Sequence, residues 1–175
     1  MRTLRGAGSS AAAKIGGPTW LLLLVLPLLA QKTHEFCAPC HAEQVADFQT
    51  HPHFKKGLSC DACHGPSAKH RASVGAAPPD RVAAPDEVPA LCGACHAGEQ
   101  KDFLESKHGK LVMARSKVKA ANCDTCHGVH NLRTTAQTLQ QCRKCHTALP
   151  AAHPAAAASC MSCHARHTLL AASPR

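Results

Sequence analysis

The chain has 175 residues, a formal net charge of +9, four Phe, one Trp and no Tyr. This length suits one domain, but there is no long apolar run after residue 30 and no alternating strand pattern. Such a composition excludes a fold built around a conventional side-chain core, so we expect folding to depend on a bound cofactor.

The first 30 residues have the pattern of a secretion signal. Arg2, Arg5 and Lys14 precede an apolar run from Trp20 to Ala30, which has the length of a signal-peptide core and is short for a membrane span. We therefore expect residues 1–30 to be a cleaved signal peptide, although Leu28 fits a cleavage site after Ala30 poorly. The alternative is an uncleaved N-terminal anchor in the inner membrane, facing the periplasm.

All twelve cysteines fall in six C-x-x-C-H motifs, the attachment signature of c-type haem. Structural zinc sites use C-x-x-C pairs without a histidine after each pair, disulfides would leave the six histidines unexplained, and a thioredoxin-like motif would occur once beside a βαβ pattern. We therefore predict six covalently bound haems c, each with thioether bonds to two cysteines and iron bound by the motif histidine. The predicted thioether cysteines are Cys37, Cys40, Cys60, Cys63, Cys92, Cys95, Cys123, Cys126, Cys142, Cys145, Cys160 and Cys163, and the proximal histidines are His41, His64, His96, His127, His146 and His164.

An internal repeat divides the rest of the chain. Residues 37–53 align without a gap on residues 92–108, and both read C-x-x-C-H-x6-F-x-x-[S/T]-x-H. We expect one hexahaem domain, 31–175, built of three di-haem units at 37–70, 92–130 and 142–167, with 71–90 as a linker and 148–159 as an Ala/Pro-rich connection. Short helices are expected around the haem motifs, for example over residues 42–49, and the AAAA run of the connection could add a helical turn.

Eight histidines remain outside the motifs, and the repeat selects two in each unit as candidates for the second axial ligand. They are His53, His70, His108, His130, His153 and His167. His34 and His51 are left over, and His51 is the alternative to His53. Met113 is a further alternative as sixth ligand, although nothing in the repeat marks it.

Geometry limits which histidine can serve which iron. Residues three apart on a helix share one side, whereas two axial ligands must approach iron from opposite faces of the porphyrin. His130 should therefore not bind the iron of His127, nor His167 that of His164; both should reach another haem.

Bound haem would offset the positive net charge of the chain. The three leader cations reduce the formal charge of residues 31–175 to +6, and each haem with ionised propionates adds about −1 when ferric and about −2 when ferrous. The holoprotein would then carry about zero charge oxidised and about −6 reduced, so nucleic-acid binding is not supported.

These motifs resemble the bacterial periplasmic multihaem cytochromes c, above all the decahaem cytochromes associated with porins and reductases and the pentahaem electron donor of nitrite reductase. The similarity covers about 37–167 and includes Phe48 to His53, Phe103 to His108 and the C-H-G-P-x-x-x-H of Cys63 to His70. It implies short helices and loops wrapped around a chain of bis-histidine haems, with little or no sheet. It also implies a periplasmic electron carrier between a donor such as a membrane quinol dehydrogenase and a terminal reductase or outer-membrane acceptor, with possible peripheral membrane contact.

The rival hypothesis is a multihaem reductase or oxidase, which needs an iron with an open sixth position. Nitrite reductases of the pentahaem type replace the histidine of one motif by Lys, and hydroxylamine-oxidising enzymes crosslink a Tyr to haem. All six motifs here end in His and the chain has no Tyr, so we expect an electron carrier with no catalytic residues.

Overall fold

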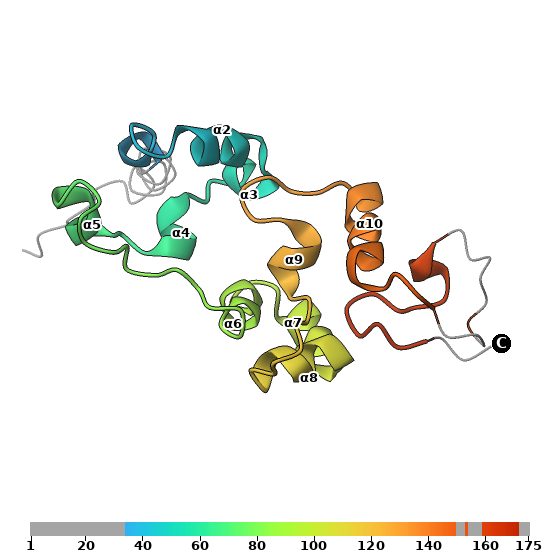
Figure 1. Ribbon diagram of the computed structural model, residues 1–175. Coiled ribbons are helices and arrows are strands. Elements are labelled where there is room, and N and C mark those ends of the chain that lie inside the picture. The colour runs from blue at the N-terminus through green and yellow to red at the C-terminus, as the bar shows by residue number, and fades with distance from the viewer. Residues whose placement is uncertain (1–33, 150–152, 154–158, 172–175) are drawn as a thin grey trace, which may run out of the picture.

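The computed structural model describes residues 34–149, 153 and 159–171, and these form a row of short helices joined by loops (Figure 1). The described residues contain no β-strand, and a single antiparallel bridge joins His164 to Ala171. Residues 34–37 are helical, and the elements that follow are α2 (Ala42–Thr50), α3 (Pro52–Lys55), α4 (Cys60–His64), α5 (Ala68–Ala72), α6 (Val88–Gly93), α7 (Ala97–Glu105), α8 (Lys107–Met113), α9 (Cys123–His127), α10 (Thr135–Cys145) and the 3-10 turn η1 (Cys160–Ser162). The prediction of a helix-and-loop fold without a sheet is confirmed.

The apolar core is very small. Among the described residues, the buried hydrophobic side chains are Val45, Val88, Phe103 and Val112. Four such side chains in four different helices cannot offset the conformational entropy of a domain this size, so the helices need another apolar partner. None of the helices in the described part is long and apolar enough to cross a membrane.

The sequence repeat is also a structural repeat. α2 and α7 are each nine residues long and begin after a motif histidine, His41 or His96; each ends where a backbone N–H bonds to the carbonyl of Phe48 or Phe103. The expected helix over 42–49 is thus α2, and its buried face carries Val45.

A second similarity is that between α4 and α9, which contain the second and the fourth haem motif. Both helices end at a glycine with positive φ, 71° at Gly65 and 82° at Gly128, a backbone conformation that residues with a Cβ rarely adopt. Ala165 stands at this position after the last motif, and there the structure has the 3-10 turn η1 instead of an α-helix.

The expected linker 71–90 is shorter than predicted, because α5 extends to Ala72 and α6 begins at Val88. The remaining loop also packs back onto the second haem motif. The Asp80 carboxylate accepts from the backbone N–H of Ser67 at 2.7 Å, and the Arg81 guanidinium donates to the carbonyl of Cys63 at 2.6 Å. This loop therefore holds the second motif in place, which its Pro/Ala-rich composition did not indicate.

Two expectations fall on residues that are not described. The proposed leader, 1–30, lies wholly outside the described residues, and so does most of the Ala/Pro-rich connection, including its AAAA run.

The contact between α7 and α8 predicts a sharp response to one added methyl group. A Cβ on Gly109 would collide with the backbone of Phe103 and Leu104, whereas a Cβ on Gly98 of α7 would meet nothing within 4 Å. We expect Gly109→Ala to destabilise the protein by about 1–3 kcal/mol through overpacking, and Gly98→Ala to be neutral or stabilising by up to about 1 kcal/mol through helix propensity. Thermal unfolding of the two purified variants measures this difference, and equal midpoints would contradict the packing seen here.

Candidate functional site

All twelve cysteines lie in the part of the chain that the structure describes, and none of them forms a disulfide there. In α4 and α9 the first cysteine of the motif opens the helix and the motif histidine closes it, so that both lie on one helical face. The described residues contain no group of three or more His, Cys, Asp or Glu side chains arranged to hold a metal ion by themselves.

Each motif histidine faces one of the six histidines that the repeat selected. No residue is shared between the pairs, and ring centres within a pair lie 5.8–6.2 Å apart. The pairs are His41 with His70 (6.1 Å), His64 with His130 (6.1 Å), His96 with His53 (5.8 Å), His127 with His167 (6.1 Å), His146 with His108 (5.9 Å) and His164 with His153 (6.2 Å).

This separation is the one that a shared iron requires. Imidazole nitrogen binds a transition metal at about 2 Å, and the ring centre lies about 1.1 Å behind that nitrogen, so two trans imidazoles have centres about 6.2 Å apart. Ordinary aromatic pairs occupy a wider window of about 4.5–7 Å and would not select one motif histidine and one other histidine six times. The donor set therefore fits haem iron bound between two histidines.

Hydrogen bonds orient three of these imidazoles. The Nδ1 atoms of His64, His70 and His164 lie 3.0, 2.7 and 3.0 Å from the backbone carbonyls of Arg81, Ala77 and Leu169, respectively. An Nδ1–H that donates to a carbonyl leaves Nε2 unprotonated, which is the form that binds a metal, and it makes the ligand more basic.

Comparison with known families agrees with this geometry. Residues 46–128 match the family model described as cytochrome c7 and related cytochrome c. The match covers a little under half of the chain and supports a multihaem c-type cytochrome. This family indicates an electron-transfer protein with covalently bound haem c, and the helical fold without a sheet of the described residues is consistent with it. Neither a curated protein nor a solved structure matches it.

The pairs join segments of the cytochrome that are far apart in the sequence. His130 lies beside His64 and not His127, and His167 lies beside His127 and not His164. Two segments exchange histidines: 37–70 sends His53 to His96, and 92–130 sends His130 to His64. A second exchange places His108 of 92–130 beside His146, and His167 of 142–167 beside His127.

His51 has a different position from these twelve histidines. Its side chain is 4% exposed, and its Nδ1 accepts the backbone N–H of His53 at 3.0 Å, which caps α3. In the repeat its counterpart is Ser106, whose hydroxyl caps α8 by accepting the N–H of Gly109 at 2.9 Å. The structure thus gives His51 a capping role and brings His53 to His96; comparing the two repeats could have revealed this from the sequence.

His34 and Met113 lie outside these six pairs. His34 packs edge-on against Phe54, with ring centres 5.2 Å apart. Met113 ends α8 with its side chain 49% exposed.

The thiols show which motifs are neighbours. Within the first segment, burial and then the nearby Cys37 raise the pKa of the Cys60 thiol to about 11. A hydrogen bond with Cys123 lowers the pKa of Cys92 to about 7, and the same bond raises the pKa of Cys123. These values describe the protein before haem attachment, since a thioether does not titrate.

The remaining contacts continue the series. Burial is the main cause that raises the pKa of Cys63, Cys126 and Cys142. The second cause is in each case a nearby cysteine: Cys92 for Cys63, Cys142 for Cys126, and Cys160 for Cys142. Each of the first five motifs therefore has a cysteine close to a cysteine of the next motif along the chain.

The first motif also borders a largely apolar hollow of about 370 Å³, where the Arg71 guanidinium lies 5.2 Å above the ring of Phe36.

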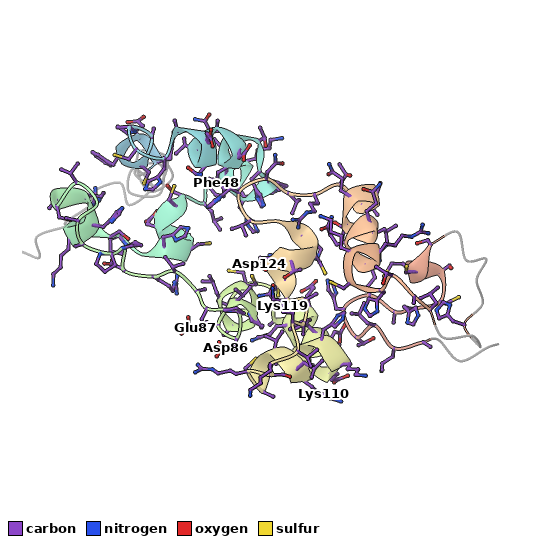
Figure 2. The ribbon with its side chains drawn as sticks, in the orientation of Figure 1. Phe48, Asp86, Glu87, Lys110, Lys119 and Asp124 are labelled. Carbon is purple, nitrogen blue, oxygen red and sulfur yellow. The ribbon has the colours of Figure 1, made fainter. Side chains whose placement is uncertain are left out.

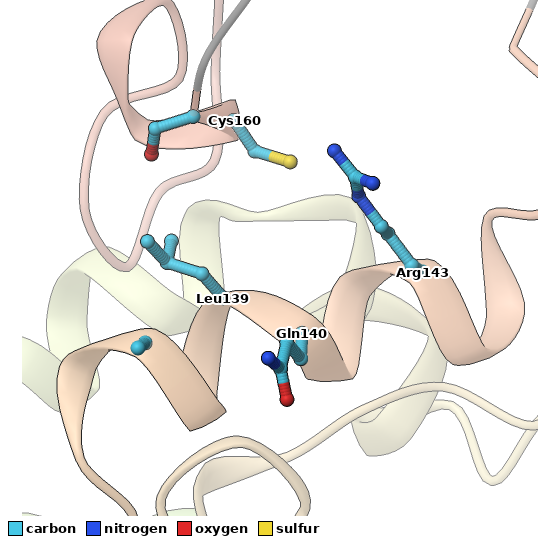
Figure 3. A pocket seen from close by; sticks show the side chains of 6 residues that line it. Leu139, Gln140, Arg143 and Cys160 are labelled. Atoms are coloured by element: carbon cyan, nitrogen blue, oxygen red, sulfur yellow. The ribbon is translucent and has the colours of Figure 1, made fainter.

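At the other end of the molecule, a hollow of about 320 Å³ lies between α10 and the last motif. Figure 3 shows Leu139 and Arg143 of α10 on one side of it and Cys160 on the other. The hollow is thus next to the position at which the last predicted haem would be attached.

The capping role of His51 leads to a prediction about spin state. His51→Ser keeps a helix-capping side chain like that of Ser106, so we expect all irons to stay low-spin and stability to change by less than about 1 kcal/mol. His53→Ser should instead open the sixth position of the iron bound by His96 and give one high-spin haem per chain. Electron paramagnetic resonance of the two oxidised variants measures this, and a high-spin signal from His51→Ser would return His51 to the ligand set.

Proposed function

We propose that this multihaem cytochrome carries six haems, each with iron between two histidines, and that it relays electrons from one end of the molecule to the other. The observation that supports this proposal is the set of six separate histidine pairs with ring centres 5.8–6.2 Å apart. Twelve histidines and twelve cysteines would then all be used, leaving only His34 and His51 for packing and capping.

The proposed electron path follows the order of the motifs in the sequence. Neighbouring cysteines link the first motif to the second (Cys37 to Cys60), the second to the third (Cys63 to Cys92) and the third to the fourth (Cys92 to Cys123). Cys126 and Cys142 link the fourth to the fifth, and Cys142 and Cys160 link the fifth to the sixth. Because each cysteine would hold a porphyrin edge, neighbouring cysteines imply neighbouring edges, as electron hopping requires.

Cysteines, histidines and backbone carbonyls would each have a role in this relay. Bound haem supplies a reversible one-electron change between Fe(III) and Fe(II). The cysteines would hold each haem in place, and the paired histidines would bind its iron. The carbonyls of Arg81, Ala77 and Leu169 keep three imidazoles in the metal-binding tautomer. Double histidine ligation should hold the potentials below those of His/Met haems, since Met raises the potential.

We further propose that the cytochrome works in the periplasm, between a membrane quinol dehydrogenase or another donor and a terminal reductase or outer-membrane acceptor. The supporting features are the basic, apolar leader at 1–30 and the resemblance to porin- and reductase-associated cytochromes. Inner-membrane anchoring through an uncleaved leader is the alternative location. The domain would begin at residue 31 and contain three di-haem units at 37–70, 92–130 and 142–167.

A catalytic role has less support than a carrier role. An enzyme of this class needs an iron whose sixth position is open to substrate, yet every motif histidine has a second histidine opposite it. We therefore propose no catalytic residue.

Haem stoichiometry and spin state together test the proposal. We expect the mass of the purified holoprotein to show six haems, electron paramagnetic resonance of the oxidised protein to show only low-spin iron, and redox titration to give potentials below the His/Met range. A high-spin signal of one iron per chain would contradict bis-histidine ligation throughout and favour the enzyme hypothesis.

The crossed pairing of His130 can be tested by removing its proposed haem. His130→Ala alone should give one high-spin iron. In a background that lacks the second haem, made by Cys60→Ala and Cys63→Ala, His130→Ala should add no further high-spin signal, because its iron is already gone. His167→Ala is the matched control, since its proposed iron is bound by His127 and should still become high-spin in that background. A new high-spin iron from His130→Ala there would show that His130 serves a different haem.

A further inference from the structure

The carboxylates of this cytochrome are confined to one part of the chain. All eleven Asp and Glu residues lie between Glu35 and Asp124, and none follows. Figure 2 labels Asp124 on α9; α10 and the segment from residue 159 lie beyond it, at the end of the molecule that carries the last two motifs. That end has no acidic side chain among its described residues, although it carries Arg133, Arg143, Lys144 and Arg166.

Bound haem makes this asymmetry larger. Residues 34–127 contain eleven Lys and Arg against eleven Asp and Glu, whereas residues 128–171 contain four cations and no carboxylate side chain. With the proposed haems at about −1 each when oxidised, the part with four motifs would carry about −4 and the part with two motifs about +2. Reduction would take these two parts to about −8 and about 0, so the C-terminal part would remain the less negative one.

The four cations at the basic end differ in their surroundings. Arg133 donates to the carbonyls of Asp124 and Thr125 at 3.1 and 3.0 Å, so it joins α10 to α9. Arg143 faces the hollow beside Cys160 (Figure 3). Lys144, between the cysteines of the fifth motif, and Arg166, just after the sixth, are exposed to solvent.

We propose that the C-terminal basic end, formed by α10 and residues 159–171, is the docking surface for an acidic redox protein, with Lys144 and Arg166 as its steering charges. This inference rests on the proposed electron relay and adds which end meets which kind of partner. Redox complexes bury little area and dissociate quickly, so complementary charge governs how often and in which orientation the partners meet. Both steering residues lie next to a motif, so a partner oriented by them would approach the last haem positions.

A protein partner fits this surface better than a membrane. Binding to anionic lipid relies on clusters of about four to eight Lys or Arg residues, and this end exposes fewer cations than that: Arg143, Lys144 and Arg166. A redox protein needs only a few steering charges, provided that opposing charges are absent nearby. No Asp or Glu side chain follows Asp124, and in the oxidised state the four cations outweigh the charge of the two proposed haems.

Charge reversal at the two ends tests the docking surface. The variant Lys144→Glu/Arg166→Glu is compared with Lys55→Glu/Lys56→Glu, which makes the same charge change at two exposed lysines of the first segment. Stopped-flow spectroscopy measures electron transfer to the fully assembled cytochrome from reduced flavodoxin, a small acidic redox protein. We expect the first variant to slow the second-order reaction at low salt by about tenfold and to flatten its salt dependence, since steering raises on-rates by about 10–10³. The control should change the rate by less than about twofold.

The outcomes separate the inference from the proposed relay. If both variants slow the reaction equally, or neither does, while the wild type still accepts electrons and holds six low-spin haems, the docking surface is wrong and the relay stands. If the wild type lacks six low-spin haems, the proposed relay itself fails. Vesicles containing anionic lipid provide the last comparison: charge-dependent binding to them, without the effect on flavodoxin, would replace the protein partner with a membrane.

Discussion

If each iron is bound by two histidines, as we propose, they must reach it from opposite faces of a porphyrin, and the C-x-x-C-H motif can supply only one of them. The second would then come from another part of the chain, and this requirement would organise the molecule. In four of the six histidine pairs the partner comes from a different segment: His53, His108, His130 and His167 each lie beside a motif histidine outside their own segment. The first and last motifs pair within their own segments, through His70 and His153.

These exchanges explain how a chain with so few buried apolar residues can hold a defined arrangement. The helices are between four and eleven residues long, below the length at which an isolated helix is stable in water. Local capping helps, as at Asn122 and Thr134, whose side chains form capping boxes at the starts of α9 and α10. Caps contribute only about 1 kcal/mol each, so the contacts that decide the fold are those between segments, which bound haem would make.

The sequence predicted the chemistry of the site better than its geometry. The motifs predicted the thioether cysteines and proximal histidines, and the repeat selected the histidines that the structure pairs with these motif histidines. Helical geometry could exclude the pairing of His130 with His127, but it could not point to His64, because that contact depends on how the segments fold back on one another. Arg81 was missed for the same reason: its bonds to Cys63 and Ala62 span 18 and 19 residues, and a Pro/Ala-rich composition reports only the local absence of a helix.

The position of His51 shows how two repeats can inform each other. Alone, a histidine two residues from a candidate ligand is a plausible alternative to it. Beside the second repeat, where Ser106 caps α8, the same position is seen to need a hydrogen-bond acceptor at the start of a helix. An imidazole can accept there only through an unprotonated nitrogen, and His51 uses Nδ1 for this bond. Helix capping and iron ligation thus require different things of two neighbouring histidines. In the structure the buried His51 caps the helix, while His53 faces His96.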